Sequence, residues 1–182
     1  MGFSLGYDPF SLYDKPEEYQ KFLDEMEKVL IAGKPAVKTY WDNGDQLLQL
    51  LRSGEVWAAS AWEQAGWKLH AENPDIDYLA PESGALAWVD TFAIPARSEN
   101  VEAAYKYINF MLRPENAAFF TNRETYGTAS KDAVKFLDPE IKANFERGLP
   151  PEVLAKINWY PTVPAGIEEM EGKTLDKIKA AR

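Results

Sequence analysis

One stretch of the sequence combines residue types that could hold a ligand. Residues 84–95 form a largely apolar run with a single acid, Asp90, two positions after Trp88. Strand alternation would place Trp88, Asp90 and Phe92 on the same face. A carboxylate beside an aromatic ring can bind a cation through an ion pair and a cation–π contact. The run therefore predicts a cation site, with a hydrogen-bonded structural aspartate as the open alternative.

A second tryptophan, Trp62, stands where a predicted strand meets a predicted helix. Residues 55–62 are mostly small and favour a strand, and residues 63–71 favour the helix that follows. In open α/β sheets, ligands bind where strands end and helices begin. Trp62 could line such a site or fill a core, and both interpretations stay open.

The elements that would position these residues give an α/β chain with a mixed sheet and flanking helices. Hydrophobic periodicity, capping residues and turn residues define them. Helices are predicted over residues 16–30, from a cap at Asp42 or Asn43 to Gly54, over 63–71, after Asn100, from Pro114, in short pieces within 131–156, and around Ile167 to Ile178. Strands or extended segments are predicted over residues 36–40, 55–62, 76–79, 84–95 and 157–161.

Composition excludes several classes of function. The 182 residues are 46% hydrophobic, and 20 basic against 29 acidic residues give a net charge of −9. With no basic stripe, nucleic acid is not expected as a partner. The absence of cysteine excludes disulfides and thiolate metal sites. No run is long enough for a transmembrane helix, and the first residues lack the features of a signal peptide, so the chain as given is expected to stay in the cytoplasm.

Enzymatic motifs are scarce. The single histidine, His70, has no nucleophile pattern around it, and no nucleotide-binding or zinc motif occurs. The sequence predicts no enzyme, no cofactor and no metal site. The open alternative is a carbohydrate-active enzyme in which Glu63 and Asp90 form a glycosidase-like pair beside tryptophans.

Several motifs together resemble the extracytoplasmic spermidine/putrescine-binding proteins of ABC transporters. The motifs are Ser53-Gly54-Glu55-Val56 leading to Trp62, Trp88-Val89-Asp90-Thr91-Phe92-Ala93-Ile94-Pro95, Tyr107-Ile108-Asn109-Phe110-Met111-Leu112-Arg113-Pro114-Glu115, and Tyr126. The resemblance runs from about Tyr7 to the C-terminus, but only to the C-terminal half of the family. It implies a truncated solute-binding component with a periplasmic-binding-protein type 2 fold.

The resemblance also implies roles for individual residues. Trp62, Trp88 and Tyr126 would form an aromatic box around the methylene chain of a polyamine, and Asp90 would receive an ammonium group. Some relatives carry a further acid three positions after Trp62, where this chain has Ala65 and offers Glu63 instead. A late polar contact of the family would fall near Trp159 and Tyr160, so Glu63, Trp159 and Tyr160 are possible secondary contacts.

The implied two-lobed architecture divides the chain into three segments. Residues 1–86 and 135–182 would belong to the second lobe, and residues 87–134 to the first lobe. The complete protein would work in the periplasm with an ABC permease. With half of the ligand cleft absent, polyamine binding by this chain alone is expected to be weak or lost.

Residues 87–134 would then lack the sheet that they normally join. An unpaired strand and uncovered apolar helix faces favour association with another chain. Exchange of elements between two copies would satisfy both, so a homodimer is predicted, swapped through residues 87–134. A third possibility is a structural fragment without a ligand, in which the aromatic residues fill a core or an interface.

Overall fold

The computed structural model of the protein describes residues 1–181 and divides them into two compact units. The first unit comprises Met1–Tyr40, Pro81–Trp88 and the segment that begins at Lys156. The second unit comprises Trp41–Ala80 and Val89–Ala155. Each unit is held together by its own contacts, so the two are described separately.

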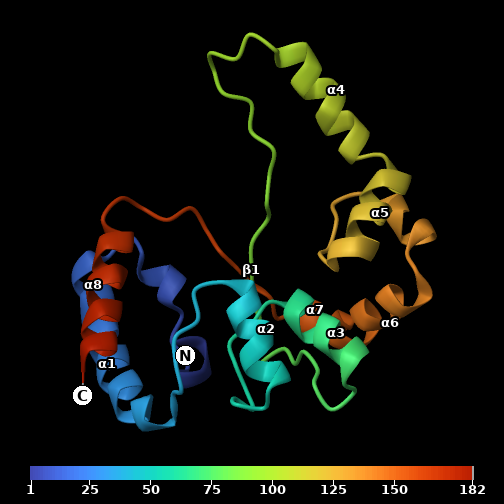
Figure 1. Ribbon diagram of the computed structural model, residues 1–182. Coiled ribbons are helices and arrows are strands. Elements are labelled where there is room, and N and C mark those ends of the chain that lie inside the picture. Colours follow the sequence, from blue (N-terminus) through green and yellow to red (C-terminus); the bar gives the residue numbers. More distant parts are fainter. Residues whose placement is uncertain (182) are drawn as a thin grey trace. The chain divides into compact units, whose positions relative to one another are not determined.

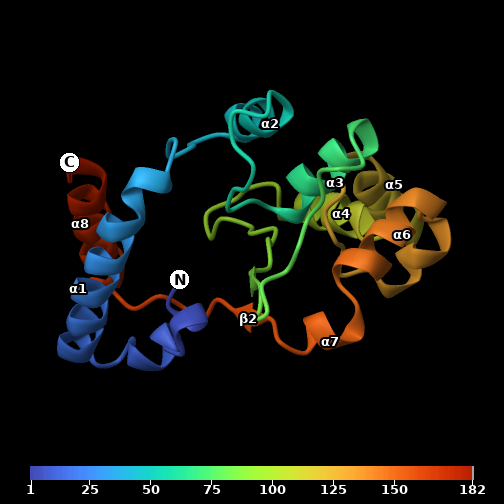
Figure 2. The same cartoon turned by 90° about the horizontal axis from the view of Figure 1, so that it is seen from below.

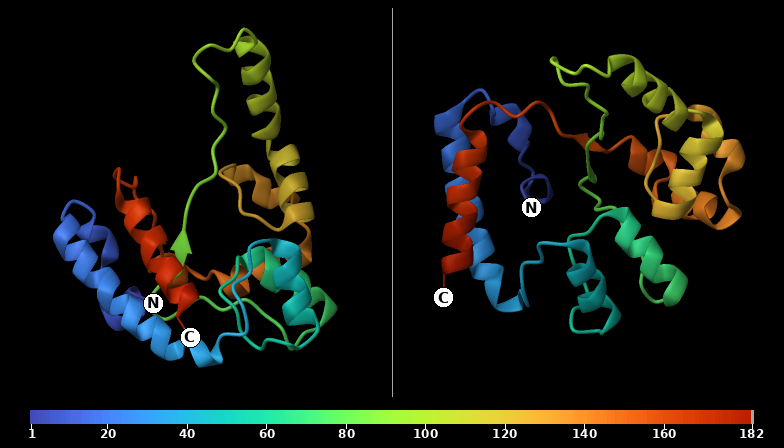
Figure 3. Two further views of the ribbon diagram at one scale, coloured as in Figure 1. Left: turned by 60° about the vertical axis from the view of Figure 1, so that its left-hand side comes forward. Right: turned by 45° about the horizontal axis from the view of Figure 1, so that its top comes forward.

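The first unit is built on two helices that lie side by side, α1 and α8 (Figures 1 and 3). Helix α1 spans Pro16–Gly33 and α8 spans Ile167–Ala180. Proline at the first position and two acids in the first turn favour the start of α1, because they suit its backbone angle and its dipole. Three short 3₁₀ helices accompany them: η1 (Phe3–Leu5), η2 (Pro9–Leu12) and η3 (Lys34–Ala36).

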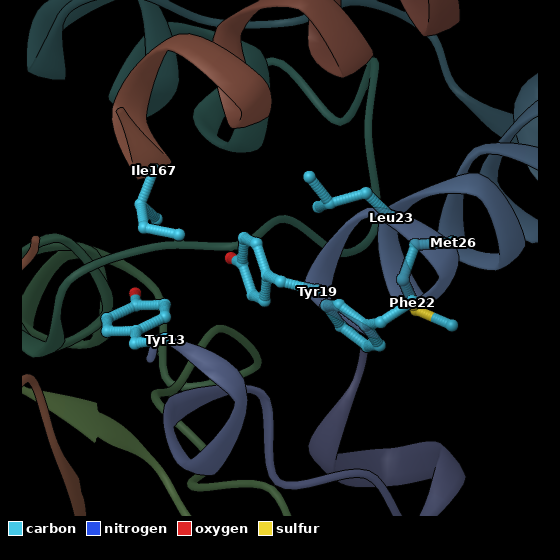
Figure 4. Packing of buried hydrophobic residues seen from close by; sticks show 6 residues of the cluster. All are labelled: Tyr13, Tyr19, Phe22, Leu23, Met26 and Ile167. Atoms are coloured by element: carbon cyan, nitrogen blue, oxygen red, sulfur yellow. The ribbon is translucent and has the colours of Figure 1, made fainter. Parts of the chain in front are cut away.

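An apolar cluster joins α1 to the start of α8 (Figure 4). The buried side chains of α1 recur every three or four residues, which places them on one face of the helix. The buried members of the cluster are Tyr13, Tyr19, Phe22, Leu23, Met26 and Ile167. The Tyr19 hydroxyl also donates to Glu171 Oε1 at 2.5 Å. The first unit therefore has a core of its own.

The only sheet in residues 1–181 lies in the first unit. It pairs β1 (Leu86–Ala87) with β2 (Asn158–Trp159) in parallel. Gly84 precedes β1 with φ +94°, and a Cβ there would lie 2.0 Å from the Lys156 carbonyl oxygen. Only glycine permits both this backbone angle and this close approach of the two segments.

The second unit is helical. Its helices are α2 (Gly44–Arg52), α3 (Glu63–Glu72), α4 (Val101–Met111), α5 (Pro114–Glu124), the 3₁₀ helix η4 (Lys131–Phe136), α6 (Pro139–Gly148) and α7 (Pro151–Leu154). The Asn43 side chain caps α2, since its oxygen accepts from the Gln46 amide at 2.9 Å. Helices α3 and α6 lie side by side in this unit (Figures 1 and 2).

The centre of this group is Trp67 on α3, which is 1% exposed. Its ring centroid lies 4.8 Å from that of Phe145 on α6 and 6.0 Å from that of Tyr78. A Cβ on Gly66 would lie 2.7 Å from the Tyr78 Cβ, so glycine is required where the backbone at Tyr78 lies against α3. Trp67 therefore packs both α6 and the residues around Tyr78 against α3.

Helix α4 stands apart from this packing. None of its residues is buried, although its sequence is rich in apolar residues. Residues 88–100, which lead into α4, form neither helix nor strand (Figure 1). The large apolar side chains exposed on this segment, on α4 and on α5 are Trp88, Val89, Phe92, Val101, Tyr105, Tyr107, Phe110, Leu112, Phe119 and Phe120. The predicted apolar helix faces are therefore uncovered.

Several predicted strands are wrong. Residues 36–40, 55–62 and 76–79 contain no strand, and of residues 84–95 only Leu86–Ala87 belong to one. An isolated extended segment leaves its backbone groups without partners, so a strand needs a neighbouring strand as well as a suitable sequence. Residues 1–181 supply that neighbour only where β2 meets β1.

The predicted α/β class is confirmed, although the sheet is one short parallel pair. The predicted helices are all present, and extended residues 158 and 159 form β2. The division into lobes at residues 86 and 134 stays a prediction. No helix within residues 1–181 is long and apolar enough to span a membrane.

The burial of Leu23 in the apolar cluster between α1 and α8 predicts how much stability is lost when its side chain is shortened. Leu23→Ala should lower the free energy of unfolding by about 2–5 kcal/mol, because it leaves a cavity between α1 and α8. Leu79→Ala is a matched control, because Leu79 is 84% exposed and its loss should cost no more than about 0.5 kcal/mol. Urea denaturation followed by circular dichroism measures both, and equal losses would contradict the assigned core.

Candidate functional site

Trp62 occupies the position just before the first residue of α3. Its ring packs edge-on against that of Trp41, with centroids 4.9 Å apart. Trp41 is itself held, because its Nε1 donates to the Ser60 carbonyl oxygen at 2.9 Å. Trp62 is half-buried, so part of its ring faces solvent. The predicted helix start is confirmed, and it fixes Trp62 at the edge of the second unit's packing.

Glu63 is the first residue of α3 and is half-buried. Burial raises the pKa of its carboxyl group, and a hydrogen bond from its own backbone amide partly opposes that shift. The amide dipoles at a helix start also favour a negative charge. The ionisation of Glu63 therefore reflects two opposing influences, burial and the amide groups of the helix start.

Tyr126 follows α5 and reaches back to α3. Thr125, the residue before it, has φ 62° and ends α5 in the left-handed conformation. The Tyr126 hydroxyl donates to Gln64 Oε1 at 2.9 Å. Burial raises the pKa of Tyr126, and so do the negative charges of Glu63, Asp90 and Glu124. The structure thus brings Tyr126 to the first turn of α3, although the two lie far apart in sequence.

Asp90 lies on the exposed extended segment before α4. The expectation of a carboxylate buried on a strand face is wrong, because no neighbouring strand covers residues 88–95. Within residues 1–181, neither Asp90 nor Glu63 has an ion-pair partner. Neither acid is therefore neutralised by a basic side chain within the described residues.

Three further predicted contacts belong to the first unit. Trp88 follows β1 and is 50% exposed. Trp159 pairs with Ala87 in the sheet, and its side chain is exposed. The Tyr160 ring lies 5.2 Å from that of Phe10, and its pKa is raised by burial and by the charge of Glu171. Tyr160 thus takes part in the packing of its own unit.

Sequence reasoning missed Gln64, Trp41 and Tyr78. Gln64 accepts the Tyr126 hydroxyl, and Trp41 supports the ring of Trp62. Tyr78 has a raised pKa, because it is buried and lies near the charge of Glu63. Only the position of Gln64 beside Trp62 and Glu63 could have indicated a role.

The site has the donors of neither a metal centre nor a histidine-based catalyst. No group of three or more His, Asp or Glu side chains within residues 1–181 could hold a metal ion. His70 is hydrogen-bonded, with its Nδ1 2.8 Å from the Ile76 carbonyl oxygen. The chemistry on offer is aromatic surface, carboxylate charge and one tyrosine hydroxyl.

Comparison with known proteins identifies the family. Residues 2–148 match the bacterial extracellular solute-binding proteins. This chain belongs to that family. The relatives include the putrescine-binding periplasmic protein PotF of Escherichia coli, 26% identical over 98% of this chain and 48% of its own length.

Two further relatives carry similar names. The spermidine/putrescine-binding periplasmic protein of Escherichia coli is 31% identical over 92% of this chain and 46% of its own length. The putrescine/cadaverine-binding protein of Pseudomonas aeruginosa is 30% identical over 78% of this chain and 40% of its own length. The family resemblance read from the motifs is confirmed. The chain spans about half the length of these curated relatives.

The burial of Glu63 predicts a distinct pH dependence of stability. Because its pKa is raised in the folded state, folding favours the protonated form, and stability falls as pH rises from the usual to the raised pKa. Glu63→Gln cannot ionise, so the variant should gain stability relative to the wild type through that interval. Denaturation at a series of pH values measures the difference.

Glu72 provides a control of opposite sign. Its pKa is lowered mainly by its hydrogen bond with Arg52, whose Nε lies 2.6 Å from Glu72 Oε2. That pairing contributes stability above the usual carboxyl pKa, which is lost as pH falls. Glu72→Gln should therefore lose stability relative to the wild type as pH rises. Identical profiles for the two variants would refute the assigned environment of Glu63.

Proposed function

We propose that this chain carries part of the polyamine site of an extracytoplasmic solute-binding protein. The observation that carries the proposal is the hydrogen bond of the Tyr126 hydroxyl with Gln64, which brings this ring to the helix start that carries Trp62 and Glu63. Family membership and the names of the relatives support a ligand of this class. Polyamines are flexible polycations, and such a surface suits them.

Each residue would recognise one part of the ligand. The methylene chain would lie against Trp62 and Tyr126, because apolar groups gain from contact with rings. An ammonium group would pair with Asp90, and a ring facing a desolvated cation adds about 0.5–2 kcal/mol. The roles of Trp88, Trp159 and Tyr160, which belong to the first unit, stay predictions from the family resemblance.

The proposed activity is binding without covalent chemistry. In the complete protein, the lobes would close over the ligand and present it to an ABC permease in the periplasm. The ligand would shift the open–closed equilibrium by its differential affinity for the two forms. Because the chain spans about half the length of its relatives, we expect its own affinity for polyamines to be weak.

The rival function is a carbohydrate-active enzyme that uses Glu63 and Asp90. The raised pKa of Glu63 would suit the general acid of such an enzyme, and the enzyme would have to hydrolyse a glycoside. A chromogenic glycoside should be hydrolysed by the enzyme and left intact by the binding protein. The names of the relatives favour binding.

We further propose a homodimer formed through residues 87–134. Helix α4 has no buried residue, and Phe92 and Phe110 are about half exposed, at 53% and 50%. The extended segment before α4 has no strand partner within residues 1–181. A second copy offers the same apolar side chains and the same free backbone edge, so one symmetric contact would cover both.

Loss of the Asp90 charge should weaken polyamine binding. Calorimetric titration of spermidine and putrescine should show saturable binding to the wild type, and Asp90→Asn should reduce the affinity by about 10-fold or more, the usual size of a charged hydrogen bond. Asp176→Asn makes the same change on an exposed part of α8 and should bind like the wild type. Equal loss in both variants, or no binding to the wild type, would refute the proposed site.

The dimer is tested by the mass of the chain in solution. Light scattering at micromolar concentration should give twice the chain mass of 20.6 kDa. Phe110→Glu should shift the protein to the monomer, because it places a charge in the apolar contact. Leu79→Glu, at an exposed position outside residues 87–134, should leave the dimer intact. A compact wild-type monomer would exclude the dimer.

A further inference from the structure

We infer that residues 76–80 form a strap that covers Trp67, and that the ion pair between Asp77 and Arg147 holds this strap closed. The strap is a conformational device of the second unit and does not depend on the proposed ligand site. Its opening would uncover Trp67 while the other helices of the unit stay folded. Such a local opening needs less free energy than unfolding of the whole chain.

The strap lies directly on α3. Residues 76–80 form neither helix nor strand, and Tyr78 is half-buried whereas Asp77 before it is exposed. The Tyr78 ring packs edge-on against that of Trp67, with an angle of 78° between the ring planes. A Cβ on Gly66 would lie 2.9 Å from the Tyr78 backbone nitrogen, so no side chain fits between the strap and the helix. The inner side of the strap therefore covers Trp67, and its outer side carries Asp77.

Helix α6 holds the outer side of the strap. Arg147 Nε donates to Asp77 Oδ2 at 2.9 Å, and Arg147 Nη2 donates to Asp77 Oδ1 at 3.1 Å. A bidentate pair of this kind fixes the orientation of both groups as well as their distance. Arg147 Nη2 also donates to Oδ1 of the buried Asn144 at 3.1 Å, so the guanidinium is oriented from its own helix. The ion pair thus joins the strap to α6.

The surroundings of Asp77 favour its ionised form, which the ion pair requires. Burial acts to raise its pKa, but hydrogen bonds from Arg147 and the Tyr78 amide, with the charges of Arg147 and His70, hold the pKa below its usual value. His70 Nδ1 lies 3.9 Å from Asp77 Oδ2 and donates to the Ile76 carbonyl oxygen at 2.8 Å. The strap is therefore tied to α3 as well as to α6.

One contribution opposes the closed strap. The indole nitrogen of Trp67 is buried and has no hydrogen-bond partner within residues 1–181. A buried donor without a partner costs free energy, and water can accept from it once the strap opens. Closure therefore depends on the contacts of the strap, of which the bidentate ion pair is the strongest. Removal of that pair should shift the strap toward its open state.

Hydrogen exchange of the full chain, followed by nuclear magnetic resonance, tests the strap. Arg147→Gln removes the guanidinium and keeps a polar side chain. The Trp67 indole proton and the amides of Ile76 and Tyr78 should exchange about 5-fold faster or more, the effect of a partly exposed ion pair at the upper end of the usual range. Amides within α2 and α5, in the same unit, should keep their wild-type rates, because the opening is local.

Arg52→Gln is the matched control, since it breaks a bidentate pair of the same unit outside the strap. Arg52 Nε and Nη2 lie 2.6 and 2.7 Å from the carboxylate oxygens of Glu72. This variant should leave the exchange of the Trp67 indole proton unchanged. Asp77→Asn should act like Arg147→Gln, and the double variant should exchange no faster than either single one, because the same interaction is lost only once.

The outcomes separate release of the strap from a general loss of stability. Unchanged exchange of the Trp67 indole proton in both Arg147→Gln and Asp77→Asn would overturn the inference. Equal acceleration in Arg52→Gln, or acceleration that extends to α2 and α5, would overturn it too. If Arg147→Gln does not fold, Arg147→Lys serves instead, because it keeps the charge and loses the bidentate geometry. Its Trp67 indole proton should still exchange faster than in the wild type.

Discussion

The hydrogen bond between Tyr126 and Gln64 is the contact on which the candidate site depends. This bond is 2.9 Å long and links Tyr126, two residues after α5, to Gln64 in the first turn of α3. The same turn carries Glu63 and follows Trp62, so one contact aligns aromatic and acidic side chains. Thr125, the residue before Tyr126, ends α5 in the left-handed conformation.

Glu63 and Glu72 show how the surroundings of a carboxyl group set its pKa. Burial raises the pKa of Glu63, and the hydrogen bond with Arg52 lowers the pKa of Glu72. The ionised form of Glu63 therefore costs stability, whereas the ionised form of Glu72 contributes stability. In the proposed function, a cationic ligand would compensate the cost at Glu63.

Membership of the bacterial extracellular solute-binding proteins gives the exposed apolar surface a context. The chain spans about half the length of its curated relatives, and α4 with its flanking segments has no buried side chain. Apolar side chains that face water contribute little to stability, and an exposed apolar surface of this kind favours association with a partner. In the proposed homodimer, a second copy of the chain would cover it with the same apolar side chains.

The sequence by itself determined the helices, the family and the residues worth testing. Helix periodicity and capping are local properties, so α1, α2 and α8 could be read directly. The strands could not, because a strand depends on a distant partner, and the predicted strand around Trp88 and Asp90 found none beyond β1. Only the tertiary structure decided that Asp90 is exposed, and that Tyr126 meets Gln64 beside Glu63. The contact between Tyr126 and Gln64 joins residues more than sixty positions apart, so it depends on how the chain folds back to the first turn of α3.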